Sequence, residues 1–129
     1  MRVDFRYLTI HVPNVWQTCE WYHQVFDFNA VLSADGTSAR LNAAGQALFF
    51  AAHDDQDELL GPRRLNSFLS DPPALHLSLA TADVPALFDH ALAHGAVAVR
   101  EPEALPTGQR VASIRDLNGL LILLREQGY

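Results

Sequence analysis

The chain has 129 residues, of which 49% are hydrophobic and 19% carry a charged side chain. These proportions are typical of a globular protein rather than a disordered one. The length predicts a single domain over residues 1–129, or else two very small domains that share a core. The formal net charge of −6 argues against a nucleic-acid partner, because nucleic-acid affinity depends on neutralising phosphates with basic side chains.

The single cysteine, Cys19, excludes a disulfide framework, and a reducing cytoplasm is the natural compartment for such a chain. The N-terminus lacks the apolar segment of a signal peptide, and no apolar run is long enough to span a membrane. We therefore expect a soluble, cytoplasmic protein with no membrane contact. Cys19 is expected to pack in the core rather than act as a catalytic thiol, because an apolar environment raises the pKa of a thiol.

The first predicted elements are a strand over residues 7–14 and a helix that follows it. Asn14 is placed to cap this helix, with Gln17 reaching back as in a capping box. Apolar residues alternate along the strand and then recur at helical spacing: Leu8, Ile10 and Val12, followed by Val15, Cys19, Tyr22 and Phe26. Three further short strands are predicted over residues 28–32, 38–41 and 47–52.

The same pattern begins again 69 residues later, so that position 7 corresponds to 76 and position 14 to 83. A strand over residues 76–83 leads to a helix with Asp83 as its cap, Pro85 in its first turn and Gly95 at its end. Strands over 96–100, 110–114 and 120–124 complete the second copy. We predict two β-α-β-β-β modules, at about 5–53 and 75–125, joined by a linker over 54–74.

The linker contains an acidic cluster made of Asp54, Asp55, Asp57 and Glu58. Carboxylates gathered in this way could bind a metal ion. Such runs are more often a solvated loop or the start of a helix, and that is our interpretation here.

Five features stand at fixed places in the two modules: Val12-Pro-Asn14, Trp21-Tyr22, Phe26-Asp-Phe28, the strand 76–83 and Asp116-Leu-Asn-Gly119. In these features the chain resembles the vicinal oxygen chelate superfamily, which includes glyoxalase I, extradiol dioxygenases, fosfomycin-resistance enzymes and bleomycin-resistance proteins. The resemblance covers roughly residues 5–53 and 74–125. It implies an α+β fold in which two tandem βαβββ modules, with mixed and antiparallel sheets, form a cup.

The resemblance also implies where a metal would be held. Metal-using members place one ligand seven residues before each helix cap and another, usually Glu, four residues after each turn glycine. In this chain the four positions are Tyr7, Phe49, His76 and Leu123. Phe49 and Leu123 have no donor atom and a neutral tyrosine is a poor ligand, whereas a divalent cation needs about three protein donors.

A site rebuilt from other residues is disfavoured, because His11 lies roughly 13 Å along the strand from Tyr7 at the usual rise per residue. We therefore expect a member of the superfamily that has lost its metal ligands and has no cofactor. A divalent metal such as Zn, Ni, Mn or Fe is the less expected alternative.

Two functions of different kinds are consistent with these residues. The first is metal-independent binding of a small, largely apolar or aromatic molecule by Tyr7, Phe49, His76 and Leu123, as the resemblance to bleomycin-resistance proteins implies. The second is a lyase, isomerase or dioxygenase that uses a rebuilt metal site or His76 as a base. His76 could instead be purely structural, and a chain that binds only a protein partner is a weaker possibility.

Three further expectations concern the surroundings of the site. Trp16, Trp21 and Tyr22 could add stacking surface, although Tyr22 is better explained as structural and the two tryptophans could lie at a dimer interface. Arg40 could pair with an anionic group if it shares the cup face of its strand. The length and the resemblance together predict a homodimer.

Overall fold

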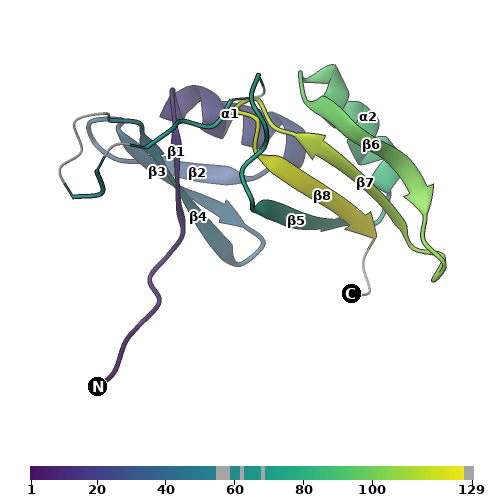
Figure 1. Ribbon diagram of the computed structural model, residues 1–129, viewed down its shortest axis with the longest axis horizontal. Coiled ribbons are helices and arrows are strands. Elements are labelled where there is room, and N and C mark those ends of the chain that lie inside the picture. The colour runs from purple at the N-terminus through teal and green to yellow at the C-terminus, as the bar shows by residue number, and fades with distance from the viewer. Residues whose placement is uncertain (55–58, 62, 68, 127–129) are drawn as a thin grey trace. The chain divides into compact units, whose positions relative to one another are not determined.

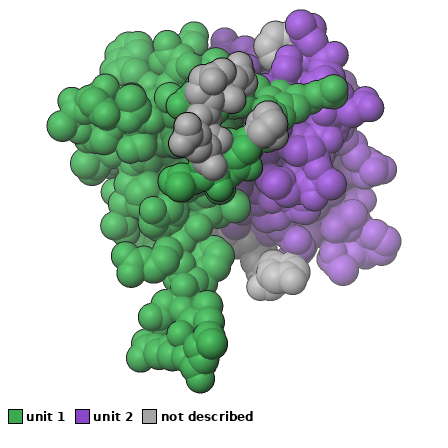
Figure 2. Space-filling model, turned by 60° about the vertical axis from the view of Figure 1, so that its left-hand side comes forward, with its two compact units in different colours: residues 1–65 green, residues 66–129 purple. Residues whose placement is uncertain are grey.

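The computed structural model describes residues 1–54, 59–61, 63–67 and 69–126 (Figure 1). The chain divides into two compact units, Met1–Leu65 and Asn66–Tyr129, which Figure 2 shows in two colours. Each unit is described by itself below. Three of the four residues in the acidic cluster, Asp55, Asp57 and Glu58, lie outside the described residues, so their predicted exposure stays a prediction.

The first unit is one four-stranded sheet with one helix. Its sheet order is β1-β4-β3-β2, with β1 parallel to β4 and the other neighbours antiparallel. The elements are β1 (Thr9–Val12), α1 (Val15–Phe26), β2 (Asn29–Leu32), β3 (Ser38–Ala43) and β4 (Gln46–Ala52).

The second unit repeats this topology, with sheet order β5-β8-β7-β6 and a parallel pair formed by β5 and β8. Its elements are β5 (His76–Thr81), α2 (Val84–Ala93), β6 (Val97–Ala104), β7 (Arg110–Arg115) and β8 (Leu121–Glu126). The predicted α+β class and the two βαβββ modules are confirmed.

The two units also agree in register. Thr9 is paired with Phe49 in the first unit, and Ser78 with Leu123 in the second. Ser78 lies 69 residues after Thr9, which is the offset of the sequence repeat. The equivalence of Phe49 and Leu123, inferred from the turn glycines, is therefore present in the strand pairing.

Side-chain caps start both helices, as the sequence predicts. The Asn14 carboxamide oxygen accepts from the Gln17 amide at 2.9 Å, and the Asp83 carboxylate accepts from the Ala86 amide at 3.1 Å. Each cap satisfies a backbone donor of the first turn that has no partner within the helix, which stabilises the helix by about 1 kcal/mol. The caps also fix the residue at which each helix begins after the first strand of its unit.

Each helix covers one face of its own sheet (Figure 1). In both units the covered face is apolar and holds the core, because strand alternation sends every second side chain to it. The largest fully buried residues of the two cores include Tyr22, Leu41 and Phe50 in the first unit and Ile114, Ile122 and Leu124 in the second. The opposite face of each sheet, called the open face below, carries the alternate residues.

Two details of the predicted packing were wrong. The apolar alternation of the predicted strand places Leu8 on the core side with Ile10 and Val12, but Leu8 precedes β1 and is 45% exposed. On α1 the buried side is wider than predicted and includes Thr18, Trp21 and Val25, while Phe26 is half-buried against the rings of Trp21, Tyr22 and Phe28.

The two helices have 12 and 10 residues. Among the described residues, no helix therefore has the length and apolar character that crossing a membrane requires.

A buried aspartate holds the loop between β7 and β8. Asp116 is 1% exposed, and its carboxylate accepts from the backbone amides of Asn118 at 2.8 Å and Leu120 at 2.9 Å. The equivalent connection of the first unit is a two-residue turn with positive φ at Ala44 and Gly45, which needs no side-chain acceptor. Asp116 thus sets the path of the chain into β8, where Leu123 lies.

Replacing Asp116 with Ala should lower the free energy of unfolding by about 2 kcal/mol, because the buried Leu120 amide and the part-buried Asn118 amide lose their acceptor. Asp116→Asn retains an acceptor oxygen and should cost less. Urea denaturation measures both, and Asp89→Ala on the exposed side of α2 is the control. Equal midpoints for Asp116→Ala and Asp89→Ala would contradict this role.

Candidate functional site

Strand pairing arranges the open face of the second unit in two rows. Leu123 of β8 lies between Ser78 of β5 and Ser113 of β7. Leu121 lies one row away, between His76 and Arg115. These six side chains share a face because they occupy alternate positions of neighbouring strands.

A pocket of about 240 Å³ lies on this face. It is lined by His76, Val99, Ser113, Leu121, Ile122 and Leu123. Two predicted site residues, His76 and Leu123, are thus brought together in one pocket whose other lining is mainly aliphatic. The volume is slightly below the 300 Å³ or so at which ligand pockets begin, so it suits a small molecule or one group of a larger molecule.

His76 contacts a residue that the sequence analysis missed. Its Nε2 lies 3.1 Å from the Ser78 hydroxyl oxygen. Ser78 is the hydrogen-bond partner of the His76 ring among the residues that the structure describes. The hydroxyl can accept from or donate to imidazole, so it orients the ring without fixing its charge. Strand alternation alone could have identified Ser78, since it follows His76 by two residues on the same face.

The open face of the first unit carries the other predicted pair. The rings of Tyr7 and Phe49 lie with centroids 4.0 Å apart and planes inclined by 30°. Tyr7 precedes β1, but its ring packs against Phe49. Half of the residue is therefore covered, and its exposed fraction is 50%. Arg40 of β3 is paired with Phe49. Arg40 therefore shares this face, as its possible pairing with an anionic group requires.

The residues at the four family positions do not fit a metal ion. They offer one imidazole and one phenol, and Phe49 and Leu123 offer no donor. In the first unit, His11 lies on the open face, and its two ring nitrogens are 3.1 and 3.2 Å from an Arg63 nitrogen. A guanidinium at this distance disfavours a bound cation. Among the described residues, no group of three or more His, Cys, Asp or Glu side chains could hold a metal.

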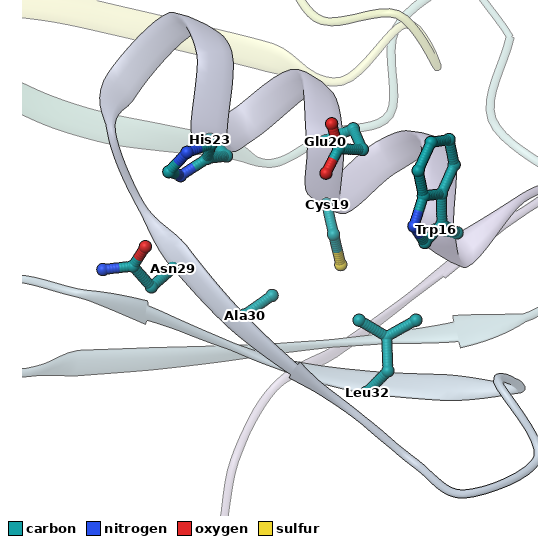
Figure 3. A pocket seen from close by; sticks show the side chains of 7 residues that line it. All are labelled: Trp16, Cys19, Glu20, His23, Asn29, Ala30 and Leu32. Atoms are coloured by element: carbon teal, nitrogen blue, oxygen red, sulfur yellow. The ribbon is translucent and has the colours of Figure 1, made fainter.

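A second pocket, of about 210 Å³, lies between α1 and β2 on the helix-covered side of the first sheet (Figure 3). Its lining consists of Trp16, Cys19, Glu20, His23, Asn29, Ala30 and Leu32. In Figure 3 the Cys19 sulfur points from the helix towards the strand. Burial, followed by the charge of Glu20, raises the pKa of the Cys19 thiol, which keeps the thiol protonated and unreactive.

The aromatic residues of α1 divide differently from the prediction. Trp16 is 61% exposed and lines the second pocket, as its possible roles in stacking or at an interface require. Trp21 is only 6% exposed and Tyr22 is fully buried, and both pack in the aromatic core of the first unit. Trp21 is therefore not available for ligand stacking or for an interface, whereas the structural role expected for Tyr22 is confirmed.

Comparison with models of protein families assigns the chain to a superfamily. Residues 5–124 match the model of the Glyoxalase/Bleomycin resistance protein/Dioxygenase superfamily. This match spans nearly the whole chain, so the protein belongs to that superfamily. The comparison with curated proteins gives no match.

Several solved structures share the fold. A hypothetical protein from S. aureus has a TM-score of 0.79 at 14% identity, with 98% of this chain and 95% of that chain covered. A glyoxalase-related enzyme from Fulvimarina pelagi has a TM-score of 0.78 at 16% identity, with coverage of 96% and 88%. A bleomycin resistance determinant encoded on the transposon Tn5 has a TM-score of 0.62 at 18% identity, with coverage of 98% and 100%. At these identities the likeness establishes the fold alone.

Native Cys19 should react with a disulfide reagent such as dithionitrobenzoate at least about tenfold more slowly than in urea at the same pH, because a raised pKa lowers the thiolate fraction. A double variant, Cys19→Ala with Thr107→Cys in an exposed loop, provides an accessible thiol as control. Equal rates for native Cys19 and this control thiol would show that the Cys19 environment is not protective.

Proposed function

We propose that this protein binds a small, largely apolar or aromatic molecule on its open faces without a metal ion. The observation that carries the proposal is the pair Phe49 and Leu123. They are equivalent in register, they lie on open faces, and they occupy the positions at which the family resemblance implies acidic metal ligands. An apolar side chain at both positions removes the donors and supplies a surface that an apolar ligand can cover.

Each open face contributes a different chemistry to the proposed binding. Tyr7 and Phe49 form an aromatic pair on which a ring can stack. The pocket at His76 and Leu123 is mainly aliphatic, and His76 and Ser113 add an imidazole and a hydroxyl to its lining. In this proposal His76, held by Ser78, gives a ligand one directed hydrogen bond, which is how mainly apolar sites usually fix orientation.

The structural likeness to the Tn5 bleomycin resistance determinant is consistent with binding rather than catalysis. The likeness to a glyoxalase-related enzyme is consistent with the alternative, in which this protein is a lyase, isomerase or dioxygenase. That alternative needs His76 as a base or a metal held by other residues. It is the weaker candidate, since the described partner of the His76 ring is a serine and not a carboxylate.

Metal content separates the two functions. Protein purified without a chelating tag is incubated in turn with Mn, Fe, Co, Ni and Zn, desalted, and analysed for metal per chain by mass spectrometry. We expect retention near zero for all five, because the family positions hold too few donors. Near-stoichiometric retention of one metal that is lost in His76→Ala would contradict the proposal and favour the enzyme.

Ligand binding is tested with the neutral fluorescent probe phenylnaphthylamine in the presence of a chelator. We expect binding that the chelator does not change. Phe49→Ala and Leu123→Ala should each raise the probe's Kd about fivefold, since each removes part of the apolar contact area. Trp16→Ala is the matched control, because Trp16 is an exposed aromatic residue of α1 outside the open faces. Loss of binding only in Trp16→Ala would place the probe in the second pocket instead.

We also propose that the protein is a cytoplasmic homodimer. Exposed valines on the outermost strands support self-association: Val31 of β2 is 66% exposed and Val99 of β6 is 53% exposed. Edge strands with exposed apolar side chains are commonly covered by a partner. Size-exclusion chromatography with light scattering should give twice the 14.3 kDa of the chain, and the mass of a single chain at micromolar concentration would contradict a dimer.

A further inference from the structure

The sheet of the first unit differs in charge from the rest of the chain. The chain has 15 acidic and nine basic residues, yet none of the described strands of this unit, β1 to β4, contains an aspartate or a glutamate. The charged residue within these strands is Arg40. The open face of the first unit is therefore locally basic in an acidic protein.

Arg40 lies in the same row as the aromatic pair. It is paired with Phe49 on one side and with Val31 on the other, and Phe49 in turn is paired with Thr9. The Arg40 side chain is exposed, and the hydrogen bonds and ion pairs among the described residues do not engage it. Arg40 is thus an exposed cation on the strand position next to Phe49.

A second guanidinium lies against the same face one row further along. Arg63 donates to the Gly61 carbonyl oxygen at 2.9 Å, and one of its nitrogens lies 3.1 and 3.2 Å from the two ring nitrogens of His11. His11 is two residues after Thr9 in β1, which is about 6.6 Å along a strand. Arg63 is therefore held in place by its own contacts and extends the positive charge of this face.

We propose that the ligand of this face is an aromatic anion, meaning a planar ring that carries a carboxylate, sulfonate or phosphate group. The ring lies against Tyr7 and Phe49, and the acidic group pairs with Arg40, whose two terminal nitrogens match two oxygens of such a group. Arg63 adds attraction at longer range and disfavours a cationic ligand. This inference rests on the proposed binding function and names the class of molecule that is bound.

Two fluorescent probes that differ in a sulfonate group test this inference. Anilinonaphthalene sulfonate is the anionic probe, and phenylnaphthylamine is its neutral counterpart. Each is titrated into the wild type, Arg40→Met and Arg110→Met. The control, Arg110, is an exposed arginine at the start of β7, so both variants lose one positive charge. Thermal melts establish that both variants are folded.

In Arg40→Met we expect the affinity for the anionic probe to fall about tenfold relative to the affinity for the neutral probe, as the loss of a partly exposed charged hydrogen bond predicts. Arg110→Met should leave this ratio within about twofold of the wild-type value. Added salt should lower the affinity of the wild type for the anionic probe, because ions screen an exposed charge. The same salt should lower the affinity of Arg40→Met by less.

The outcomes distinguish this inference from the function on which it rests. Binding of both probes with an unchanged ratio in Arg40→Met overturns the aromatic anion and leaves small-molecule binding in place. An equal change in Arg40→Met and Arg110→Met indicates a general effect of net charge, which also overturns it. If neither probe binds the wild type, the proposed function itself is contradicted.

Discussion

Parallel pairing between the first and the last strand of each unit is the constraint on which the candidate site depends. A parallel pair needs a crossover connection, and in each unit α1 or α2 with two further strands provides it. The pairing brings a residue from the start of the unit beside one from its end. Tyr7 thereby meets Phe49, and His76 meets Leu123, although more than 40 positions separate each pair along the chain.

Most of this arrangement could be predicted from the sequence, because the same strand and helix pattern occurs twice and each copy supports the interpretation of the other. The caps Asn14 and Asp83 mark equivalent positions, and alternation along the strands then assigns each face. Packing around the helix was harder to predict. The buried side of an amphipathic helix is broad, so Trp21, adjacent to the predicted core residue Tyr22, is buried as well. Leu8 differs in the other direction: it continues the apolar alternation, yet it lies before the first residue of β1 and is 45% exposed.

The polar parts of the site were predicted less completely than its apolar parts. A general base is usually paired with a carboxylate, whereas the partner of the His76 ring is the Ser78 hydroxyl on the same face, which no charge pattern in the sequence indicates. The contact of Arg63 with His11 joins positions 52 residues apart, and a segment outside the repeat supplies the arginine. Alternation says nothing about such a residue. The second pocket likewise depends on how α1 lies on β2, which no periodicity reports.

The proposed metal-free binding and the proposed anionic ligand have a common physical origin in Phe49. A glutamate at this position would lie directly across from Arg40 on the same face, where opposite charges on paired strands attract. That carboxylate would both serve as a metal ligand and neutralise the guanidinium. With phenylalanine there, the face loses a metal donor and gains an aromatic surface, and Arg40 keeps its charge for another partner. In the proposed function, the change that removes a metal donor from this face is thus the same change that fits the face to an aromatic anion.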